Sequence, residues 1–145
     1  MENVRVSIVL PAYNEADTIK KAVEEVRKEL SKYYKEDEYE IIIAEDGSTD
    51  GTDRIASDLA SKYSNIIHLH SDRRLGKGRA IVEAFKTSKG EILVFMDTDL
   101  STDLKHLKEL IDSIKEGYDV ATGSRLMKMS ETERPFKRDF ASKAY

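Results

Sequence analysis

Five short apolar runs recur along the chain and constrain its fold more than any other feature. The runs are rich in β-branched residues, and stretches such as "EIIIA" and "ILVFM" are continuously apolar instead of alternating with polar residues. Strands that are buried on both faces have this pattern, which is typical of a parallel sheet covered by helices. We therefore predict strands at Val6–Leu10, Glu40–Ala44, Asn65–Leu69, Glu91–Met96 and Tyr118–Ala121.

Segments with apolar residues at helical spacing separate these runs. The first contains Ile19, Val23, Val26 and Leu30, and similar patterns begin at Ile55, Ala80 and Leu104. Strand and helix thus alternate four times, which predicts an α/β fold with a mostly parallel sheet flanked by helices.

Three further expectations concern the ends of these elements. Gly90 and Gly117 stand where a helix has to end before the next strand, and we expect them at the C′ position. The polar, irregular segment Met127–Arg138 predicts a loop that leads into a final helix.

The bulk properties exclude several classes of protein. The chain has 145 residues, which predicts a single domain over residues 1–145. Its 24 basic and 28 acidic residues give a formal charge of −4, so we expect no nucleic acid partner. The absence of cysteine favours a reducing compartment and a cytoplasmic location. No run of about 18 apolar residues occurs, so we expect no transmembrane segment in this chain.

Unusual polar clusters follow each predicted strand. They read "PAYNEAD", "EDGSTDGT", "SDRRLGKGR", "DTDLS" and "GSR" in chain order. Ligands of open parallel sheets bind beyond the carboxyl ends of the strands. We therefore expect these clusters to form one site at one edge of the sheet.

Asp97 and Asp99 flank Thr98 directly after the fourth strand. Two carboxylates in a turn can converge on a hard cation such as Mg²⁺ or Mn²⁺ and leave positions for ligand oxygens. The alternative is that they cap the next helix, which begins near Ser101 and Asp103.

Two other clusters have the chemistry of a nucleotide site. Asp46, at the end of the second strand, can accept hydrogen bonds from a ribose hydroxyl or a base N–H, although its segment is also a well-made turn. Lys77 and Arg79 belong to a basic, glycine-containing loop ahead of a helix, which can approach a phosphate or can simply be solvated.

The three histidines give a weaker signal. His68 and His70 alternate on one predicted strand and can share a face, but the sequence offers no third metal ligand beside them. We therefore predict structural roles for both, and no specific role for His106.

In this order and spacing, "VLPAYNEADTI", "AEDGSTDGT", "GKGRAIVEAF", "FMDTDLS" and "ATGSR" resemble glycosyltransferase family 2. The resemblance extends through "RPFKRDFASKA" to the dolichyl-phosphate mannose synthases and dolichyl-phosphate glucosyltransferases. It implies a Rossmann-like nucleotide-diphospho-sugar transferase fold, the A-type glycosyltransferase fold. It also implies a metal-dependent, inverting transfer of a hexose from UDP-glucose or GDP-mannose to a polyprenyl phosphate.

The resemblance also assigns roles to individual residues. It implies that Pro11, Tyr13, Glu15, Asp46, Asp97 and Asp99 bind the donor. We expect Lys77 and Arg79 of the basic loop, and Thr98 between the two acids, to bind it as well. Asp97 and Asp99 are the metal ligands, with Ser101 as a further candidate, and they form the catalytic set together with Arg125. The acceptor phosphate is expected to meet Arg125, Arg138 and Ser142. Glu45 stands where the family usually has aspartate.

The family's catalytic domain usually continues past Tyr145, so we expect this domain to be incomplete at its C-terminus. The full-length protein is then expected at the cytoplasmic face of the membrane. A lipid phosphate needs no general base, whereas a saccharide hydroxyl does, and Glu131 and Glu133 are the candidates for one. The alternatives are a same-fold transferase acting on a saccharide, a non-catalytic nucleotide-binding fragment, and a phosphatase with a D-x-D-x-S nucleophile motif.

Overall fold

The computed structural model describes residues 3–98, 104–115, 120–121, 126–127 and 139–142. Within these residues, seven strands form one sheet in the order β3-β2-β1-β4-β7-β5-β6. Their bounds are β1 Val6–Ala12, β2 Tyr39–Asp46, β3 Ile66–Ser71, β4 Ile92–Phe95, β5 Val120–Ala121, β6 Leu126–Met127 and β7 Asp139–Ser142. The pairs from β3 through β5 are parallel, and only the pair of β5 and β6 among the described strands is antiparallel.

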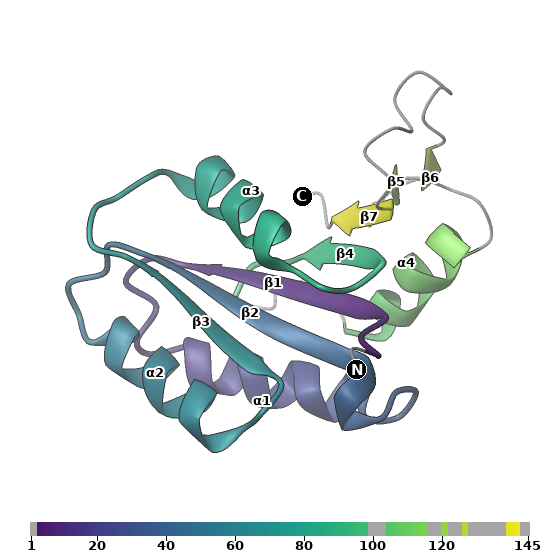
Figure 1. Cartoon of the computed structure of the whole chain (residues 1–145), viewed down its shortest axis with the longest axis horizontal. Coiled ribbons are helices and arrows are strands. Elements are labelled where there is room, and N and C mark those ends of the chain that lie inside the picture. Colours follow the sequence, from purple (N-terminus) through teal and green to yellow (C-terminus); the bar gives the residue numbers. More distant parts are fainter. Residues whose placement is uncertain (1–2, 99–103, 116–119, 122–125, 128–138, 143–145) are drawn as a thin grey trace.

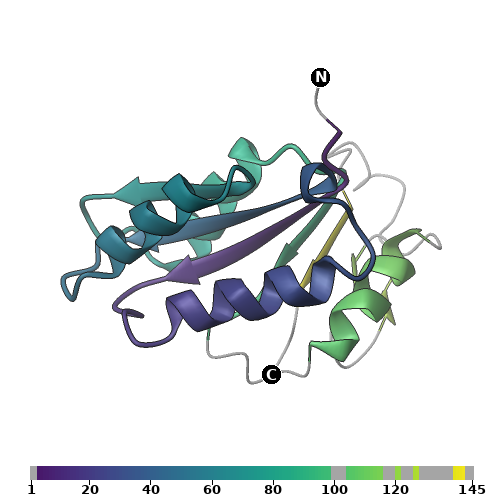
Figure 2. The same cartoon turned by 90° about the horizontal axis from the view of Figure 1, so that it is seen from below.

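Helices cover both faces of the sheet, as parallel connections require. They are α1 Ile19–Leu30, α2 Thr52–Lys62, α3 Lys77–Thr87 and α4 Lys105–Lys115, with a short 3₁₀ turn at Glu36–Glu38. Helices α1, α2 and α4 pack on one face and α3 packs on the other (Figures 1 and 2). This arrangement confirms the predicted α/β class.

The continuous apolar runs arise because each strand is buried from both sides. In β2, Ile41 and Ile43 face the core beneath α1 and α2, whereas Ile42 and Ala44 face α3. All eight residues of β2 are buried, so no polar alternation could have marked this strand in the sequence.

Two predictions about element ends are wrong. The expected helix after the loop at Met127–Arg138 is replaced by strand β7, which pairs with β4 and β5. Backbone pairing with two neighbouring strands outweighs the local propensity of so short a segment. Residues 128–138 of that loop, and Gly117, lie outside the described residues.

Gly90 does not act as a left-handed helix cap. Helix α3 ends at Thr87, and the N–H of Gly90 donates a 2.8 Å hydrogen bond to the hydroxyl of Ser7 on β1. A Cβ at position 90 would lie 2.6 Å from that hydroxyl oxygen. The glycine is therefore required for close packing against β1 rather than for a positive φ.

Within the described ranges, the helices are all too short or too polar to cross a membrane.

Candidate functional site

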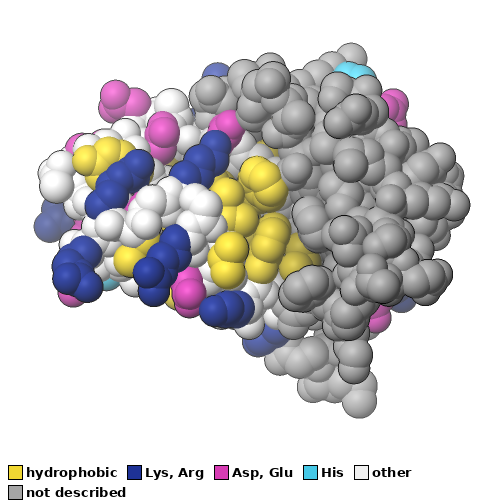
Figure 3. Space-filling model, turned by 90° about the horizontal axis from the view of Figure 1, so that it is seen from above, with side chains coloured by type: hydrophobic (Ala, Val, Ile, Leu, Met, Phe, Trp, Pro, Cys, Tyr) yellow, Lys and Arg dark blue, Asp and Glu magenta, His cyan; other side chains and the backbone are white. Residues whose placement is uncertain are grey.

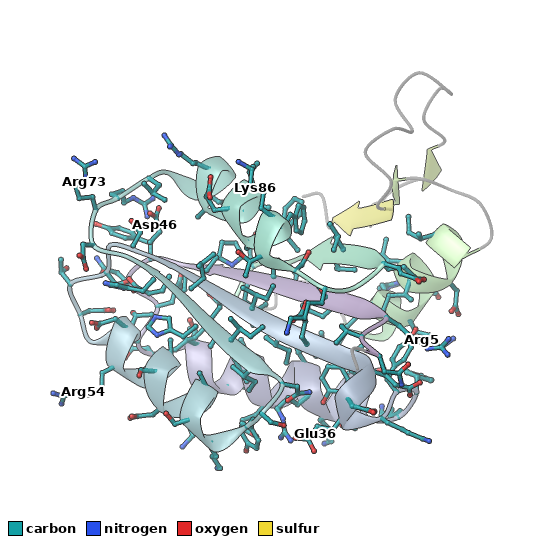
Figure 4. All side chains as sticks on the ribbon, viewed as in Figure 1. Arg5, Glu36, Asp46, Arg54, Arg73 and Lys86 are labelled. Atoms are coloured by element: carbon teal, nitrogen blue, oxygen red, sulfur yellow. The ribbon has the colours of Figure 1, made fainter. Side chains whose placement is uncertain are left out.

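A cleft of about 220 Å³ opens at the carboxyl ends of the central strands. Its lining comes from the ends of β1 and β2, the segments after β1, β3 and β4, and the start of α3, and consists of Pro11, Ala12, Tyr13, Glu15, Asp46, Arg74, Lys77, Ala80 and Asp97. Figure 4 shows Asp46 and Arg73 at this end of the sheet, with Arg5 and Glu36 at the opposite end. The structure thus brings together Pro11, Tyr13, Glu15, Asp46, Lys77 and Asp97, six of the predicted site residues.

Tyr13 and Arg74 form the outer wall of the cleft. Tyr13 is 40% exposed, and the guanidinium carbon of Arg74 lies 3.6 Å from the centre of its ring. In this cation–π contact the guanidinium is stacked on one face of the aromatic ring. The pair can therefore present both a stacking surface and an anion-binding group to one ligand.

Asp46 holds the basic loop in place. Its carboxylate is almost fully buried and accepts hydrogen bonds from the backbone N–H groups of Leu75 and Gly76, at 2.6 and 3.0 Å. Arg74 lies 3.3 Å from the same carboxylate. Without ligand, Asp46 is therefore an organiser of the loop that follows β3.

Gly47 permits this close approach of two loops. Its φ is +67°, and a Cβ there would lie 2.8 Å from the backbone nitrogen of Arg74. Any other residue at position 47 would combine an unfavourable backbone conformation with a steric clash.

Asp97 and Lys77 meet on the inner side of the cleft. The ammonium of Lys77, in the first turn of α3, donates a 2.6 Å hydrogen bond to Oδ1 of Asp97, the second residue after β4. The Asp97 side chain is 27% exposed and that of Lys77 is 53% exposed. Its carboxylate oxygens are hard donors of the kind that Mg²⁺ and Mn²⁺ prefer, so Asp97 can contribute one ligand to a divalent metal.

A hydrogen-bond network joins the loops after β1 and β2. The side-chain oxygen of Asn14 accepts the N–H of Thr49 at 2.8 Å, and the N–H of Glu15 donates to the hydroxyl of Thr52 at 2.9 Å. The Glu15 carboxylate accepts the hydroxyl of Thr18 at 2.9 Å. Sequence reasoning missed Asn14 and Thr52; the tolerance of asparagine for positive φ was the available signal for Asn14.

Two predicted donor-binding residues lie beside the cleft rather than on its lining. Thr98 is buried, with its hydroxyl 3.5 Å from that of Thr18. Arg79 is exposed and borders a neighbouring hollow of about 320 Å³, which Glu45 and His70 also line. Figure 3 shows Lys and Arg side chains gathered on the face that α3 covers.

Other predicted site residues cannot be placed. Asp99, Ser101, Arg125 and Arg138 lie outside the described residues. Ser142 ends strand β7, and only its backbone is described. The assignments of these five residues stay predictions.

The two histidines on β3 have a partner that the sequence did not reveal. Glu45 pairs in register with His70, accepts its Nδ1–H, and lies 3.6 Å from Nε2 of His68. The pKa of His70 is raised above its ordinary value, first by the hydrogen bond to Glu45 and then by the hydrogen bond to Asp72.

A larger hollow, of about 410 Å³, lies at the other end of the sheet. Asn3, Glu36, Tyr39 and Asn65 are among its lining residues, which belong to the amino ends of the strands and their loops. Ligands of open α/β sheets bind at the carboxyl ends instead. We therefore assign the functional site to the smaller cleft.

Comparisons with known proteins agree with this fold. The chain is 48% identical over 143 residues to glycosyltransferase AglD of Haloferax volcanii, covering 98% of this chain and 23% of that protein. It is 33% identical over 141 residues to a dolichol-phosphate mannosyltransferase of Pyrococcus furiosus, covering 97% of this chain and 39% of that protein. The chain thus spans less than half the length of either relative.

A solved structure gives the same result for the fold. The mannosyltransferase PcManGT of Pyrobaculum calidifontis, in complex with GDP-Man and Mn²⁺, superposes with a TM-score of 0.67 at 26% identity. The match covers 83% of this chain and 36% of that one. It confirms the predicted A-type glycosyltransferase fold.

The family comparison covers almost the whole chain. The model described as Glycosyl transferase family 2 matches residues 7–144, which include all five polar clusters that follow the predicted strands in the sequence. This match argues against the phosphatase alternative. Because this match covers far more than half of the sequence, the chain belongs to glycosyltransferase family 2.

Proposed function

We propose that this chain forms the donor-binding part of an inverting glycosyltransferase. The donor is a nucleotide-diphosphate hexose, UDP-glucose or GDP-mannose, and the acceptor is a polyprenyl phosphate at the cytoplasmic face of a membrane. The dolichol-phosphate mannosyltransferase among the relatives supports the lipid acceptor, and the GDP-Man in the PcManGT structure supports the donor class.

The contact between Lys77 and Asp97 is the observation that carries this proposal. It places the half-exposed ammonium of Lys77 against the carboxylate of Asp97, inside a cleft that also contains the ring of Tyr13 and the guanidinium of Arg74. A nucleoside diphosphate offers complementary groups, namely a flat base and a charged diphosphate. The cleft therefore suits this class of ligand better than it suits an uncharged sugar.

The described residues divide into two groups by the part of the donor they suit. Pro11, Tyr13, Glu15 and Asp46 lie at the wall where a base and ribose would pack. Lys77 is long and half exposed, so its ammonium can leave Asp97 and pair with a phosphate oxygen. Arg79, in the first turn of α3, adds positive charge close to Lys77.

Asp97 would hold the divalent metal, together with Asp99 and with Ser101 as a further candidate. When bound, Mg²⁺ or Mn²⁺ would stabilise the negative charge that develops on the departing nucleoside diphosphate. The carboxylate of Asp97 offers a hard oxygen donor and already pairs with the ammonium of Lys77, and both features suit a cation at this position.

On the acceptor side, we assign Arg125, Arg138 and Ser142 to the lipid phosphate. A phosphate oxygen is already anionic near neutral pH, so it can attack without a general base, whereas a saccharide hydroxyl requires one. The guanidinium groups would orient the phosphate through paired, charge-assisted hydrogen bonds.

A thermal-shift screen with UDP, GDP and their sugars, with and without Mn²⁺, tests the donor proposal. Ligand at about 100 times its Kd stabilises the native state by about 2.7 kcal/mol. We expect one nucleotide to raise the melting temperature in a Mn²⁺-dependent manner. No shift with any of these ligands would contradict the proposal.

The acceptor is tested by following labelled sugar into an organic phase that contains polyprenyl phosphate, with this chain alone or as part of a longer protein. We expect Arg138→Ala to slow transfer by about ten- to a hundredfold, because loss of a charged hydrogen bond costs about 1.5–3 kcal/mol. Transfer to free saccharides alone would favour the saccharide alternative, and binding without turnover would favour the non-catalytic one.

A further inference from the structure

A second group of ligand-type side chains lies on the face of the sheet opposite α3. His68 and His70 are two residues apart on β3, and Glu45 stands opposite His70 on β2. Side chains two residues apart on a strand share a face, so all three converge. One potential ligand atom from each lies within 4.8 Å of the others.

The distances approach those of a tetrahedral metal site. Bonds of 2.0–2.2 Å from Zn²⁺ to nitrogen and oxygen place neighbouring ligand atoms about 3.3 Å apart. Oε1 of Glu45 lies 3.6 Å from Nε2 of His68 and contacts Nδ1 of His70. The two histidine nitrogens lie within 4.8 Å of each other. An ion would therefore separate Glu45 from His70 and hold the two imidazoles at the same spacing.

Outer hydrogen bonds already orient two of these side chains. Nε2–H of His70 donates to Oδ1 of Asp72 at 2.6 Å, which leaves Nδ1 directed at Glu45. The other oxygen of Glu45 accepts the N–H of Ser48 at 2.6 Å. Metal-binding histidines commonly donate their second N–H to a carboxylate in this way.

The imidazole of His68 supplies the independent observation. Its Nε2 is buried, and within the part of the chain that the structure describes it has no hydrogen-bond partner, because Oε1 of Glu45 lies 3.6 Å away, beyond hydrogen-bond distance. A buried polar atom without a partner costs free energy and requires an explanation. A protonated His70 would account for the contacts of its two ring nitrogens with the carboxylates of Glu45 and Asp72. It would still leave Nε2 of His68 without a hydrogen bond.

We propose that Glu45, His68 and His70 form a second metal site, distinct from Asp97. Two imidazoles and one carboxylate select Zn²⁺, Ni²⁺ or Co²⁺ over Mg²⁺, which prefers oxygen ligands. Because β3 is the edge strand of the sheet, a water molecule can complete the coordination. The ion would tie this edge strand to the end of β2, next to the loop at Gly47 and Ser48.

The test uses ZnCl₂ and CoCl₂ in a buffer free of phosphate, with Asp97→Ala as the background so that the donor site does not contribute. We expect one equivalent of Zn²⁺ by calorimetry and a visible Co²⁺ absorption typical of four-coordinate geometry. MgCl₂ in excess should not displace either ion.

Variants then identify the ligands. His68→Gln and His70→Gln should each weaken Zn²⁺ binding by more than about a hundredfold, and Asp72→Asn by about ten- to a hundredfold, the usual effect of an outer partner. His106→Gln, an exposed histidine on α4, is the matched control and should bind as before. Circular dichroism confirms that each variant is folded.

Two results would overturn the proposal. The first is that the Asp97→Ala chain fails to bind one equivalent of Zn²⁺ or Co²⁺. This measurement needs no further variant. The other is unchanged binding in folded His68→Gln. Neither result bears on the nucleotide site, because the two sets of residues do not overlap.

Discussion

Asn14 joins two loops of the site through one unusual backbone conformation. Its φ of 52° lies in the left-handed region, and its N–H donates to the hydroxyl of Ser48 at 3.0 Å. Its side-chain oxygen accepts the N–H of Thr49. Asparagine tolerates this conformation better than most residues because its short polar side chain forms local hydrogen bonds.

Two replacements of Asn14, by aspartate and by alanine, should therefore differ in their free energy of unfolding. Asn14→Asp keeps the oxygen acceptor, whereas Asn14→Ala loses the hydrogen bond and places a Cβ at positive φ without compensation. We expect the alanine variant to lower the free energy of unfolding by about 1–3 kcal/mol relative to the aspartate variant. Urea denaturation measures this difference; equal stabilities would show that other contacts join the loops.

Asp50 predicts a dependence of stability on pH. Its carboxylate accepts hydrogen bonds from the N–H and hydroxyl of Thr52 and from the N–H of Ala16. The pKa of Asp50 is lowered, mainly by the hydroxyl of Thr52. A lowered folded-state pKa gives stability that is complete above the ordinary aspartate pKa of about 3.9 and is lost as pH falls through the folded value.

Asp50→Asn removes this contribution. We expect the melting temperature of the unaltered chain to fall more between pH 6 and pH 3 than that of Asp50→Asn, since the other acids are common to both. Scanning calorimetry at the two pH values gives the comparison. Equal decreases would mean that the carboxylate of Asp50 has the same pKa in the folded and unfolded chains.

At the level of elements, the approach of β1 to the segment before β4 depends on Gly90. A Cβ there would meet the hydroxyl oxygen of Ser7 at 2.6 Å and its backbone nitrogen at 2.7 Å. Backbone atoms cannot move aside as a flexible side chain can. The pairing of the two central strands is therefore sensitive to one methyl group.

Gly90→Ala should destabilise the fold, and Gly78→Ala provides the matched control. No atom lies within 4 Å of a Cβ built on Gly78, in the first turn of α3. We expect Gly90→Ala to cost about 1–3 kcal/mol or more, as overpacking does. Gly78→Ala should instead stabilise by about 0.4–1 kcal/mol. Thermal unfolding of both variants tests this, and a Gly90→Ala chain as stable as Gly78→Ala would refute the packing argument.

The elements that the sequence predicted correctly are those whose burial leaves a pattern. Strand β2 is buried on both faces, and α1 buries Ile19, Val23, Val26 and Leu30 on one side, so each has a periodicity that can be read directly. Strand β7 has no such pattern. Its conformation depends on the neighbouring strands β4 and β5, which the local sequence does not encode.

The same distinction applies to the site. The parallel order of the strands predicted one shared edge for Asp46, Lys77 and Asp97. The contact of Glu45 with His70 and the packing of Arg74 on Tyr13 join residues that are far apart in the sequence. These contacts depend on strand register and on loop conformations, and no local pattern in the sequence indicates either.

At the scale of the whole molecule, the parallel sheet gathers four loops around one cleft and balances its charges internally. Lys77 neutralises Asp97, and Arg74 lies against Asp46. A metal ion bound at Asp97 and a diphosphate bound near Lys77 carry opposite charges. Together they can take the place of the ion pair between Lys77 and Asp97. The central claim is therefore that nucleotide affinity depends on both Mn²⁺ and Asp97.

Calorimetric titration of GDP and UDP into the chain in the presence of Mn²⁺ tests this claim most directly. We predict one equivalent of one nucleotide, with an affinity that falls about ten- to a hundredfold or more when Mn²⁺ is omitted or when Asp97 is replaced by alanine. Asp112→Ala, which removes a comparable carboxylate paired with Lys108 on α4, should bind as the unaltered chain does. Equal affinity in Asp97→Ala and Asp112→Ala would contradict the assignment of the cleft as a metal-dependent nucleotide site.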